Sequence, residues 1–467
     1  MISSLVLVLC STSIVVQTKW DFHSLLNHAM ENRAELKACD EQIQAVLWQG
    51  KEAQSHMLPR AEFNVAHRVL NEGRDLDLSA SRIQTTVATT ISNLSLEISG
   101  VPFDTGPIDL EVPLDVALPD AVHIQDNEFT SAGLKVVQPL YAGGQISLAR
   151  QAARHMHTAK TLEKEEAILK VTSEVYRAYQ SVNVLVQVRA FLKQAQSELS
   201  VFKSVIEIMA DNADPMDDRG KWGLYFLELD DLNIELNIHL AEVETNMNEA
   251  LAGLALAADI REGLSLNQIQ VKELELNKLW QKEQLKAANN NQIKKIEQGQ
   301  LAFKVLEKKE KAAYKPIVGL EAFYNYFNDS LGALPEKDCG VQLGMKMNLF
   351  SGGEIKARAA QYRSKAREYE HLSSVLANYL VVDSHQQIGQ LKLLERQIRL
   401  AEKRVALLQE RQDLALFGFK NNMADFKDYR DAFWQKCQAQ AQIFQRKNNF
   451  VQQYSALIKR WGLPESK

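Results

Sequence analysis

The chain has 467 residues, of which 46% are hydrophobic and 24% are charged. This composition is typical of a folded protein and excludes an intrinsically disordered chain. The formal net charge of −5 forces no strongly basic surface, so we do not expect nucleic acid as a partner.

Residues 2–16 are apolar or small throughout. A spanning helix needs about 20 such residues, so the run is better suited to the hydrophobic part of a secretory signal. We therefore expect residues 1–18, approximately, to be a signal peptide, although no Lys or Arg precedes the run. No later apolar stretch is long enough for a spanning helix, so any membrane passage beyond the signal must use β-strands.

Residues 19–265 are predicted to form the first of two structural repeats. Hydrophobic periodicity predicts a helix, two strands, a long helix and a return helix in chain order, over residues 21–57, 61–70, 129–137, 145–211 and 222–258. Pro59 marks the boundary between the first helix and the first strand, where no amide donor is needed.

Residues 266–467 are predicted to repeat this plan. The corresponding elements are expected over residues 280–312, 317–327, 339–349, 354–417 and 423–461. Pro316 again precedes the first strand, as Pro59 does in the first repeat.

A short motif supports the duplication most clearly. In the first half an aromatic and a small residue precede Gly143 and Gly144, and in the second half the same pattern precedes Gly352 and Gly353. Each pair stands between a predicted strand and a predicted long helix. Glycine tolerates the backbone turn that a strand needs to enter a helix, which explains why the motif lies there.

The four predicted strands each alternate between apolar and polar residues. In residues 339–349, for example, Val341, Leu343 and Met345 share one face, and Gln342 and Lys346 lie on the other. This alternation is typical of a membrane barrel with a wet lumen, and a half-buried sheet in a soluble protein has the same pattern. The strands alone leave both interpretations open.

The predicted helices are more informative. Residues 145–211 contain neither Gly nor Pro, and their apolar residues recur at helical spacing. At about 1.5 Å per residue, each long helix spans roughly 100 Å, so it is stable only when packed lengthwise on other helices. In each repeat, the two shorter helices together match the long helix in length, which predicts a cylinder of one long helix beside two stacked short ones.

These features resemble the TolC-like outer membrane efflux proteins. The resemblance rests on the Pro139-Leu140-Tyr141-Ala142-Gly143-Gly144 segment, on its counterpart ending in Gly352-Gly353, and on the Pro59 and Pro316 boundaries. It implies a mixed membrane α+β fold: four strands per chain would contribute to a trimeric 12-stranded β-barrel. A long periplasmic α-helical barrel would be built from the internal duplication. Residues 71–130 depart from the family plan and are expected to carry extra strands or an extracellular loop.

The resemblance also implies a function and partners. The chain would be the homotrimeric outer-membrane channel of a tripartite efflux or type I secretion system in a Gram-negative bacterium. It would be a passive exit duct, held in membrane lipids, for substrates delivered by a periplasmic adaptor (membrane fusion protein) and an inner-membrane pump of the RND, ABC or MFS type. A soluble periplasmic coiled-coil scaffold or adaptor is the alternative that the sequence leaves open.

Two acidic residues are candidates for a periplasmic gate. Asp425 and Asp428 follow the helix break at Gly418, with a spacing that places them on one helical face. In TolC-like channels a D-x-x-D at this place lines the periplasmic mouth, and three copies would form acidic rings that attract cations. An ordinary solvated helix face would have the same residues, so this assignment is a hypothesis.

The sequence carries no motif of an enzyme. It contains no glycine-rich phosphate loop, no G-x-S-x-G and no H-E-x-x-H. We therefore expect no catalytic residues, no cofactor and no metal site.

Overall fold

The computed structural model describes residues 19–71, 74–77, 87–91, 94–98, 101–105, 108–112, 121–125, 128–211, 219–276, 280, 285–327 and 337–464. The predicted signal peptide lies outside these ranges. The chain divides into two compact units. The helical unit comprises Met1–Asp40, Leu162–Lys294 and Val375–Lys467, and the strand unit comprises Glu41–Thr161 and Lys295–Ser374. Each unit contains residues from both predicted repeats, so the units do not correspond to the repeats. The repeat boundary at residue 265 stays a prediction.

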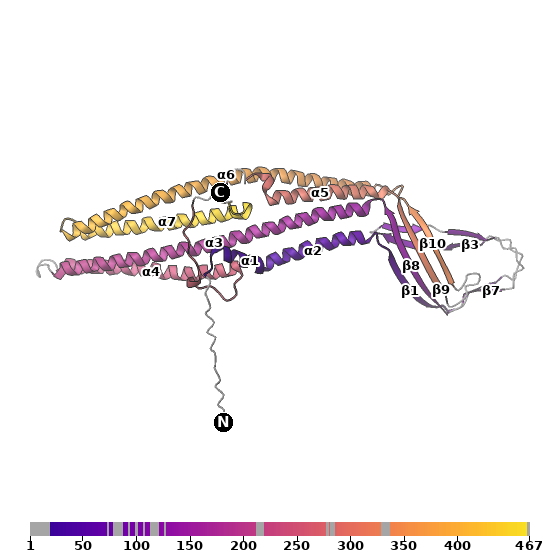
Figure 1. The fold of residues 1–467 in the computed structure, drawn as a ribbon, viewed down its shortest axis with the longest axis horizontal. Helices are drawn as coiled ribbons and strands as arrows, with labels where there is room; N and C mark the ends of the chain where they lie inside the picture. The colour runs from indigo at the N-terminus through magenta and orange to yellow at the C-terminus, as the bar shows by residue number, and fades with distance from the viewer. Residues whose placement is uncertain are drawn as a thin grey trace, which may run out of the picture. The chain divides into compact units, whose positions relative to one another are not determined.

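The strand unit contains a four-stranded antiparallel sheet (Figure 1). Its strands are β1 (Arg60–Val69), β8 (Glu128–Ala142), β9 (Ile317–Phe327) and β10 (Lys337–Lys346), in the order β1-β8-β9-β10. Strand β8 pairs with β9 across the two predicted repeats, and its register shifts between Pro139 and Tyr141. Proline lacks the N–H needed for a ladder hydrogen bond, which accounts for an irregularity at this position.

One face of this sheet is apolar and exposed. In-register neighbours place Phe63 beside Leu134 and Leu134 beside Tyr324, while Val341 lies beside Ala322. The side chains of Phe63, Val341 and Leu343 are 69%, 70% and 68% exposed. The alternation predicted from the sequence therefore places large apolar side chains on one surface of the sheet.

The strands β2 to β7 occupy much of the segment between β1 and β8. They are β2 (Arg74–Asp77), β3 (Val87–Ile91), β4 (Leu94–Ile98), β5 (Val101–Thr105), β6 (Ile108–Val112) and β7 (Ala121–Gln125). The pairing is nested, because β4 pairs with β5, β3 with β6 and β2 with β7, always antiparallel. The sequence predicts either extra strands or an extracellular loop for residues 71–130, and the structure contains extra strands there.

The two long helices, α3 (Gln145–Asp211) and α6 (Glu354–Lys420), have 67 residues each. The return helices are α4 (Arg219–Ala258) and α7 (Phe426–Trp461). The helices α3 and α6 are therefore equal in length. Together with the four-stranded sheet, these helices confirm the predicted mixed fold.

Two predicted helices are shorter or interrupted. The helix expected over 21–57 is divided into α1 (Phe22–Asn32) and α2 (Ala34–Ser55), because Arg33 has a ψ of 121° and cannot continue the helix. Arg33 instead ion-pairs with Glu174 of α3 at 2.5 Å. A capping box between Asp21 and Ser24 begins α1.

The helix expected over 280–312 begins only at α5 (Asn291–Lys311). The Asn290 side chain accepts a hydrogen bond from the Gln292 amide at 3.0 Å and donates one to the Arg460 carbonyl at 3.0 Å. Asparagine side chains compete with the helix backbone in this way, which explains the late start. Upstream, Trp280 is buried against Tyr454 of α7 instead of lying on a helix.

The core of the helical unit lies between helices that run lengthwise beside one another. Fully or nearly fully buried side chains come from α1, α3, α4, α6 and α7, and include Leu25, Val175, Leu254, Phe202, Leu236, Phe433, Leu391 and Phe450. Burying one such side chain contributes about 1.5–3 kcal/mol. The long helices are therefore held by packing along their length and not by intrinsic helix propensity.

Candidate functional site

Both Gly-Gly pairs stand where a strand gives way to a long helix. Gly143 and Gly144, with φ angles of 61° and 83°, lie between β8 and α3. Gly352 and Gly353, with φ angles of 59° and 88°, directly precede α6. All four angles lie in the left-handed region, which residues with a side chain rarely adopt. The same backbone turn is thus built twice from the same residue type.

The surroundings of the two pairs differ. A Cβ atom on Gly143 would lie 3.0 Å from the Ala312 carbonyl oxygen and 3.0 Å from Lys315 Cβ, whereas a Cβ on Gly352 would meet nothing within 4 Å. Gly143 therefore allows a close backbone approach in addition to its φ angle. Pro59 and Pro316 each directly precede a strand, β1 and β9.

The candidate gate residues lie at the start of α7. Asp425 is the N-cap of this helix, with φ −87° and ψ 159°, and Asp428 is the third residue inside it. The Asp428 carboxylate accepts a hydrogen bond from the Asp425 amide at 3.0 Å, and Asp425 accepts one from the Phe426 amide at 2.8 Å. Asp425 therefore caps the helix from just outside its first turn, and the Asp428 side chain folds back onto the Asp425 amide.

A capping role explains the D-x-x-D spacing without any gate. Two acceptors three residues apart satisfy amides that the first helical turn leaves without partners. The sequence contained this signal, since Asp at both ends of such a spacing before an apolar run is a variant of the capping box. Whether Asp425 and Asp428 also line a mouth stays a prediction.

Asp425 has a further partner that the sequence did not reveal. The Tyr225 hydroxyl of α4 donates a hydrogen bond to Asp425 Oδ1 at 2.8 Å. This bond, followed by the bond from the Phe426 amide, holds the pKa of the Asp425 carboxyl below its usual value. The two residues are 200 positions apart in the chain, so only the tertiary fold could have paired them.

The same region contains a cluster of aromatic rings and an ion pair. Tyr225 stacks on Phe426 with ring centroids 4.5 Å apart, and Phe426 stacks on Phe202 at 5.8 Å. Arg430 of α7 pairs with Glu228 of α4, with 2.6 Å between Nη1 and Oε2. These contacts hold the N-terminal part of α4 against the N-terminal part of α7.

The sheet face opposite the apolar surface carries polar side chains. Lys135 of β8 and Glu321 of β9 form an ion pair with 3.3 Å between Nζ and Oε1, and both side chains are largely buried. Gln342 of β10 lies in register with Glu321. One sheet surface is thus apolar and the other polar, as the alternation in the sequence predicted.

Within the part of the chain that the structure describes, no helix is both long enough and apolar enough to cross a membrane. Among the same residues, no group of three or more His, Cys, Asp or Glu side chains is arranged to hold a metal ion.

The architecture is similar to that of several outer-membrane proteins of known structure. The structure of VceC from Vibrio cholerae, described as an outer membrane protein, is 14% identical over 95% of this chain and 96% of its own, with a TM-score of 0.65. The outer-membrane channel OprN is 12% identical over 94% of this chain and 89% of its own, with a TM-score of 0.68. CusC, whose structures are described in terms of transmembrane channel formation, is 13% identical over 93% of this chain and 91% of its own, with a TM-score of 0.64.

Similarity at these identities establishes the fold. This chain has the fold of those outer-membrane channels over nearly its whole length. No protein-family model matches the sequence, and a search of curated proteins finds no match.

Proposed function

We propose that this protein is a passive outer-membrane exit duct rather than an enzyme. It would serve a tripartite efflux or type I secretion system in a Gram-negative bacterium. The observation that carries the proposal is the four-stranded sheet, with large exposed apolar side chains on one face and polar side chains on the other. Lipid can cover an apolar face of this kind, while the polar face suits a water-filled lumen.

The sheet edges support a homotrimer. Strands β1 and β10 are the two edges of the four-stranded sheet. Edge strands have unpaired backbone groups, which are costly in lipid unless another strand pairs with them. If β10 of one copy pairs with β1 of the next, three copies close a barrel without any edge, and four strands from each copy contribute to it.

Exposed helix faces of the helical unit support the same assembly. On α6 leucines recur every seven residues and are exposed, namely Leu393, Leu400, Leu407 and Leu414. On α4 the exposed apolar residues include Leu227, Ile234 and Ile238. From Trp222 to its end, α4 carries acidic residues and no Lys or Arg, whereas α6 has more basic than acidic residues between Lys392 and Arg411. An apolar seam flanked by opposite charges is the pattern by which long helices pair between copies.

A duct of this kind needs partners to supply energy and cargo. The sequence has no phosphate-binding loop with which to use a nucleotide. The duct would therefore receive its substrates from an inner-membrane pump through a periplasmic adaptor. The pump would choose the cargo, whether a drug, a metal or a protein.

The alternative is a soluble periplasmic scaffold or adaptor built on coiled coils. Such a protein would have no reason to expose Phe63, Val341 and Leu343 on one surface of a sheet. Exposed apolar patches of this extent are otherwise found where a partner or a membrane covers them.

Membrane fractionation of cells that express the full chain separates the two functions. We expect the protein in the outer-membrane fraction, and we expect it to migrate as a trimer after extraction in a mild detergent. A monomer or dimer in the soluble periplasmic fraction would contradict the proposed duct and support the scaffold.

A further inference from the structure

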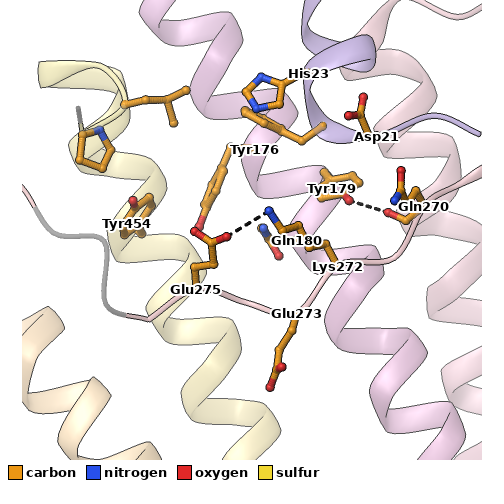
Figure 2. A pocket seen from close by; sticks show the side chains of 13 residues that line it. Asp21, His23, Tyr176, Tyr179, Gln180, Gln270, Lys272, Glu273, Glu275 and Tyr454 are labelled. Atoms are coloured by element: carbon orange, nitrogen blue, oxygen red, sulfur yellow. Dashed lines mark hydrogen bonds and ion pairs between the residues drawn. The ribbon is translucent and has the colours of Figure 1, made fainter. Parts of the chain in front are cut away.

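A cavity of about 440 Å³ lies in the helical unit (Figure 2), and neither Asp425 nor Asp428 lines it. Its walls come from Asp21–His23, from α3 and α7, from the extended segment 270–275 and from residues 463–464. The volume is in the range of sites for small organic ligands. The channel function proposed above assigns no role to this cavity.

Aromatic rings form much of the wall. Tyr176 of α3 stacks on Tyr454 of α7 with ring centroids 5.1 Å apart and an interplanar angle of 28°. The Phe22 ring packs edge to face on Tyr176, with ring centroids 5.8 Å apart, and its centroid lies 6.0 Å from that of Tyr179. The Tyr179 hydroxyl donates a hydrogen bond to the Gln270 carbonyl at 2.5 Å, which holds the extended segment against α3. The wall is therefore rigid and offers apolar contact area.

The Tyr176 hydroxyl is a polar group in this wall. Tyr176 is 8% exposed, and within the described residues its hydroxyl makes no hydrogen bond. Figure 2 shows the hydroxyl directed towards the Glu275 carboxylate. Burial raises the pKa of the Tyr176 phenol far above its usual value, so the hydroxyl remains protonated. Because Tyr176 lines the cavity, its hydroxyl is available to a ligand.

The charge around the cavity is predominantly negative. Asp21, Glu273 and Glu275 supply three carboxylates, and Lys272 is the lysine among the lining residues. Lys272 pairs with Glu275, with 3.0 Å between Nζ and Oε1, and so offsets part of this charge. Hydrogen bonds from Ser24 hold the pKa of the Asp21 carboxyl below its usual value, so it stays ionised. Among the described residues, Glu273 makes no hydrogen bond or ion pair.

We propose that this cavity binds an organic ammonium ion with an aromatic or apolar body. The body would pack on the rings, and the ammonium group would lie near Glu275, within reach of the Tyr176 hydroxyl, while Glu273 adds a second negative charge to the cavity wall. Aromatic faces and carboxylates both attract cations, and the two effects reinforce each other at a partly desolvated site. This proposal does not depend on the channel function.

Isothermal titration calorimetry on the purified full-length protein in mild detergent tests the site. The probe is 2-phenylethylamine, and 2-phenylethanol serves as its neutral counterpart. We expect saturable binding of the amine and much weaker binding of the alcohol. Replacing both Glu273→Gln and Glu275→Gln should weaken amine binding about tenfold, because two nearby negative charges are lost.

Three further variants sharpen the test. Tyr176→Phe keeps the stacked ring and should weaken amine binding severalfold, whereas Lys272→Gln should strengthen it. Glu262→Gln, an exposed acidic residue that does not line the cavity, is the matched control and should bind like the unmodified protein. The proposal is overturned if the amine does not bind, if the alcohol binds equally well, or if the double glutamate variant binds with unchanged affinity while keeping its circular dichroism spectrum.

Discussion

The ammonium group of Lys436 is among the most deeply buried charges in the helical unit. The residue is 2% exposed and pairs with Glu198 of α3, and its Nζ also lies 2.9 Å from Gln409 Oε1 of α6. Three helices therefore share one polar network within an apolar core. A buried ion pair contributes little net stability, but removal of one partner leaves the other charge uncompensated.

We expect Glu198→Gln to destabilise the protein by about 3 kcal/mol, because Lys436 would remain buried without a counter-charge. Lys436→Met should cost less, since the more exposed Glu198 keeps hydrogen bonds from Gln194 and Gln412. Chemical unfolding of the purified protein, followed by circular dichroism, measures both. Equal losses of stability in the two variants would contradict this account of the network.

The same pair gives the protein a pH dependence. Burial acts to raise the pKa of Glu198, but hydrogen bonds from Lys436 and Gln412 outweigh it, so the pKa lies below the ordinary value of 4.5. A carboxyl with a lowered pKa in the folded state contributes its stability above the unfolded pKa, and that contribution is lost as the pH falls through the folded pKa. We expect the unmodified protein to lose stability relative to Glu198→Gln as the pH falls below about 4.5. A constant difference between the two across this range would contradict the assignment.

The gate hypothesis needs variants that remove charge but keep the helix cap. Replacement of an N-cap Asp by Ala would lower the stability of the protein by about 1 kcal/mol, so a change in current could reflect either lost charge or a weakened helix. Asn caps a helix equally well and removes only the charge. We expect Asp425→Asn with Asp428→Asn to raise single-channel conductance and lower cation preference. Asp425→Ala with Asp428→Ala should give the same electrical change with an added loss of stability. If currents through the asparagine variant are unchanged, the two carboxylates are only caps.

At the scale of elements, the two strand-to-helix junctions offer a matched pair of substitutions. Ala in a left-handed conformation costs about 1–2 kcal/mol. Gly352→Ala should lower the stability of the protein by no more than this conformational cost, because the space around Gly352 is open. Gly143→Ala should cost about 1 kcal/mol more, because its Cβ would crowd the Ala312 carbonyl oxygen. Thermal denaturation of the trimer in detergent compares the two, and an equal effect would show that the close approach at Gly143 is unimportant.

The two faces of β10 offer a second pair. Leu343 lies on the exposed apolar face, and Gln342, its neighbour, lies on the polar face in register with Glu321. An arginine on the lipid side of a barrel costs about 2–4 kcal/mol near the middle of the bilayer. We expect Leu343→Arg to reduce the amount of membrane-inserted trimer sharply, and Gln342→Arg to leave it nearly unchanged. Equal tolerance of both substitutions would mean that lipid does not cover the apolar face.

Much of this arrangement could be predicted from residue patterns. The alternation in β10 and the long run of helical spacing in α3 are strong signals, because one face of each element must be buried or covered. The break at Arg33 and the late start at Asn291 were not predicted. Both depend on side chains that bond to distant partners, Glu174 and the Arg460 carbonyl, which periodicity does not report.

The sequence pattern identifies the candidate gate residues but not their role. The D-x-x-D spacing pointed to Asp425 and Asp428, yet a gate and a capping box use the same spacing. The hydrogen bond from Tyr225 and the ion pair between Arg430 and Glu228 depend on how α4 and α7 meet in the fold. The sequence contains the residues for these contacts but no local signal that pairs them.

At the scale of the whole molecule, a single chain leaves three features without partners. They are the edges of the sheet at β1 and β10, the apolar face of the sheet, and the leucines of α6 that recur every seven residues. Assembly of three copies in a bilayer would cover all of them at once, since strand edges pair, lipid contacts the apolar face and helices pack between copies. A soluble scaffold would leave the sheet face exposed to water.

In the proposed function, three copies of the chain form a water-filled pore through a lipid bilayer. Single-channel recording of the purified, full-length protein in a planar lipid bilayer tests it most directly, with the Leu343→Arg variant as a control for insertion. We predict discrete conductance steps of uniform size with the unmodified protein and few or none with the variant. A protein that is folded by circular dichroism but gives no conductance steps at any voltage would contradict the claim.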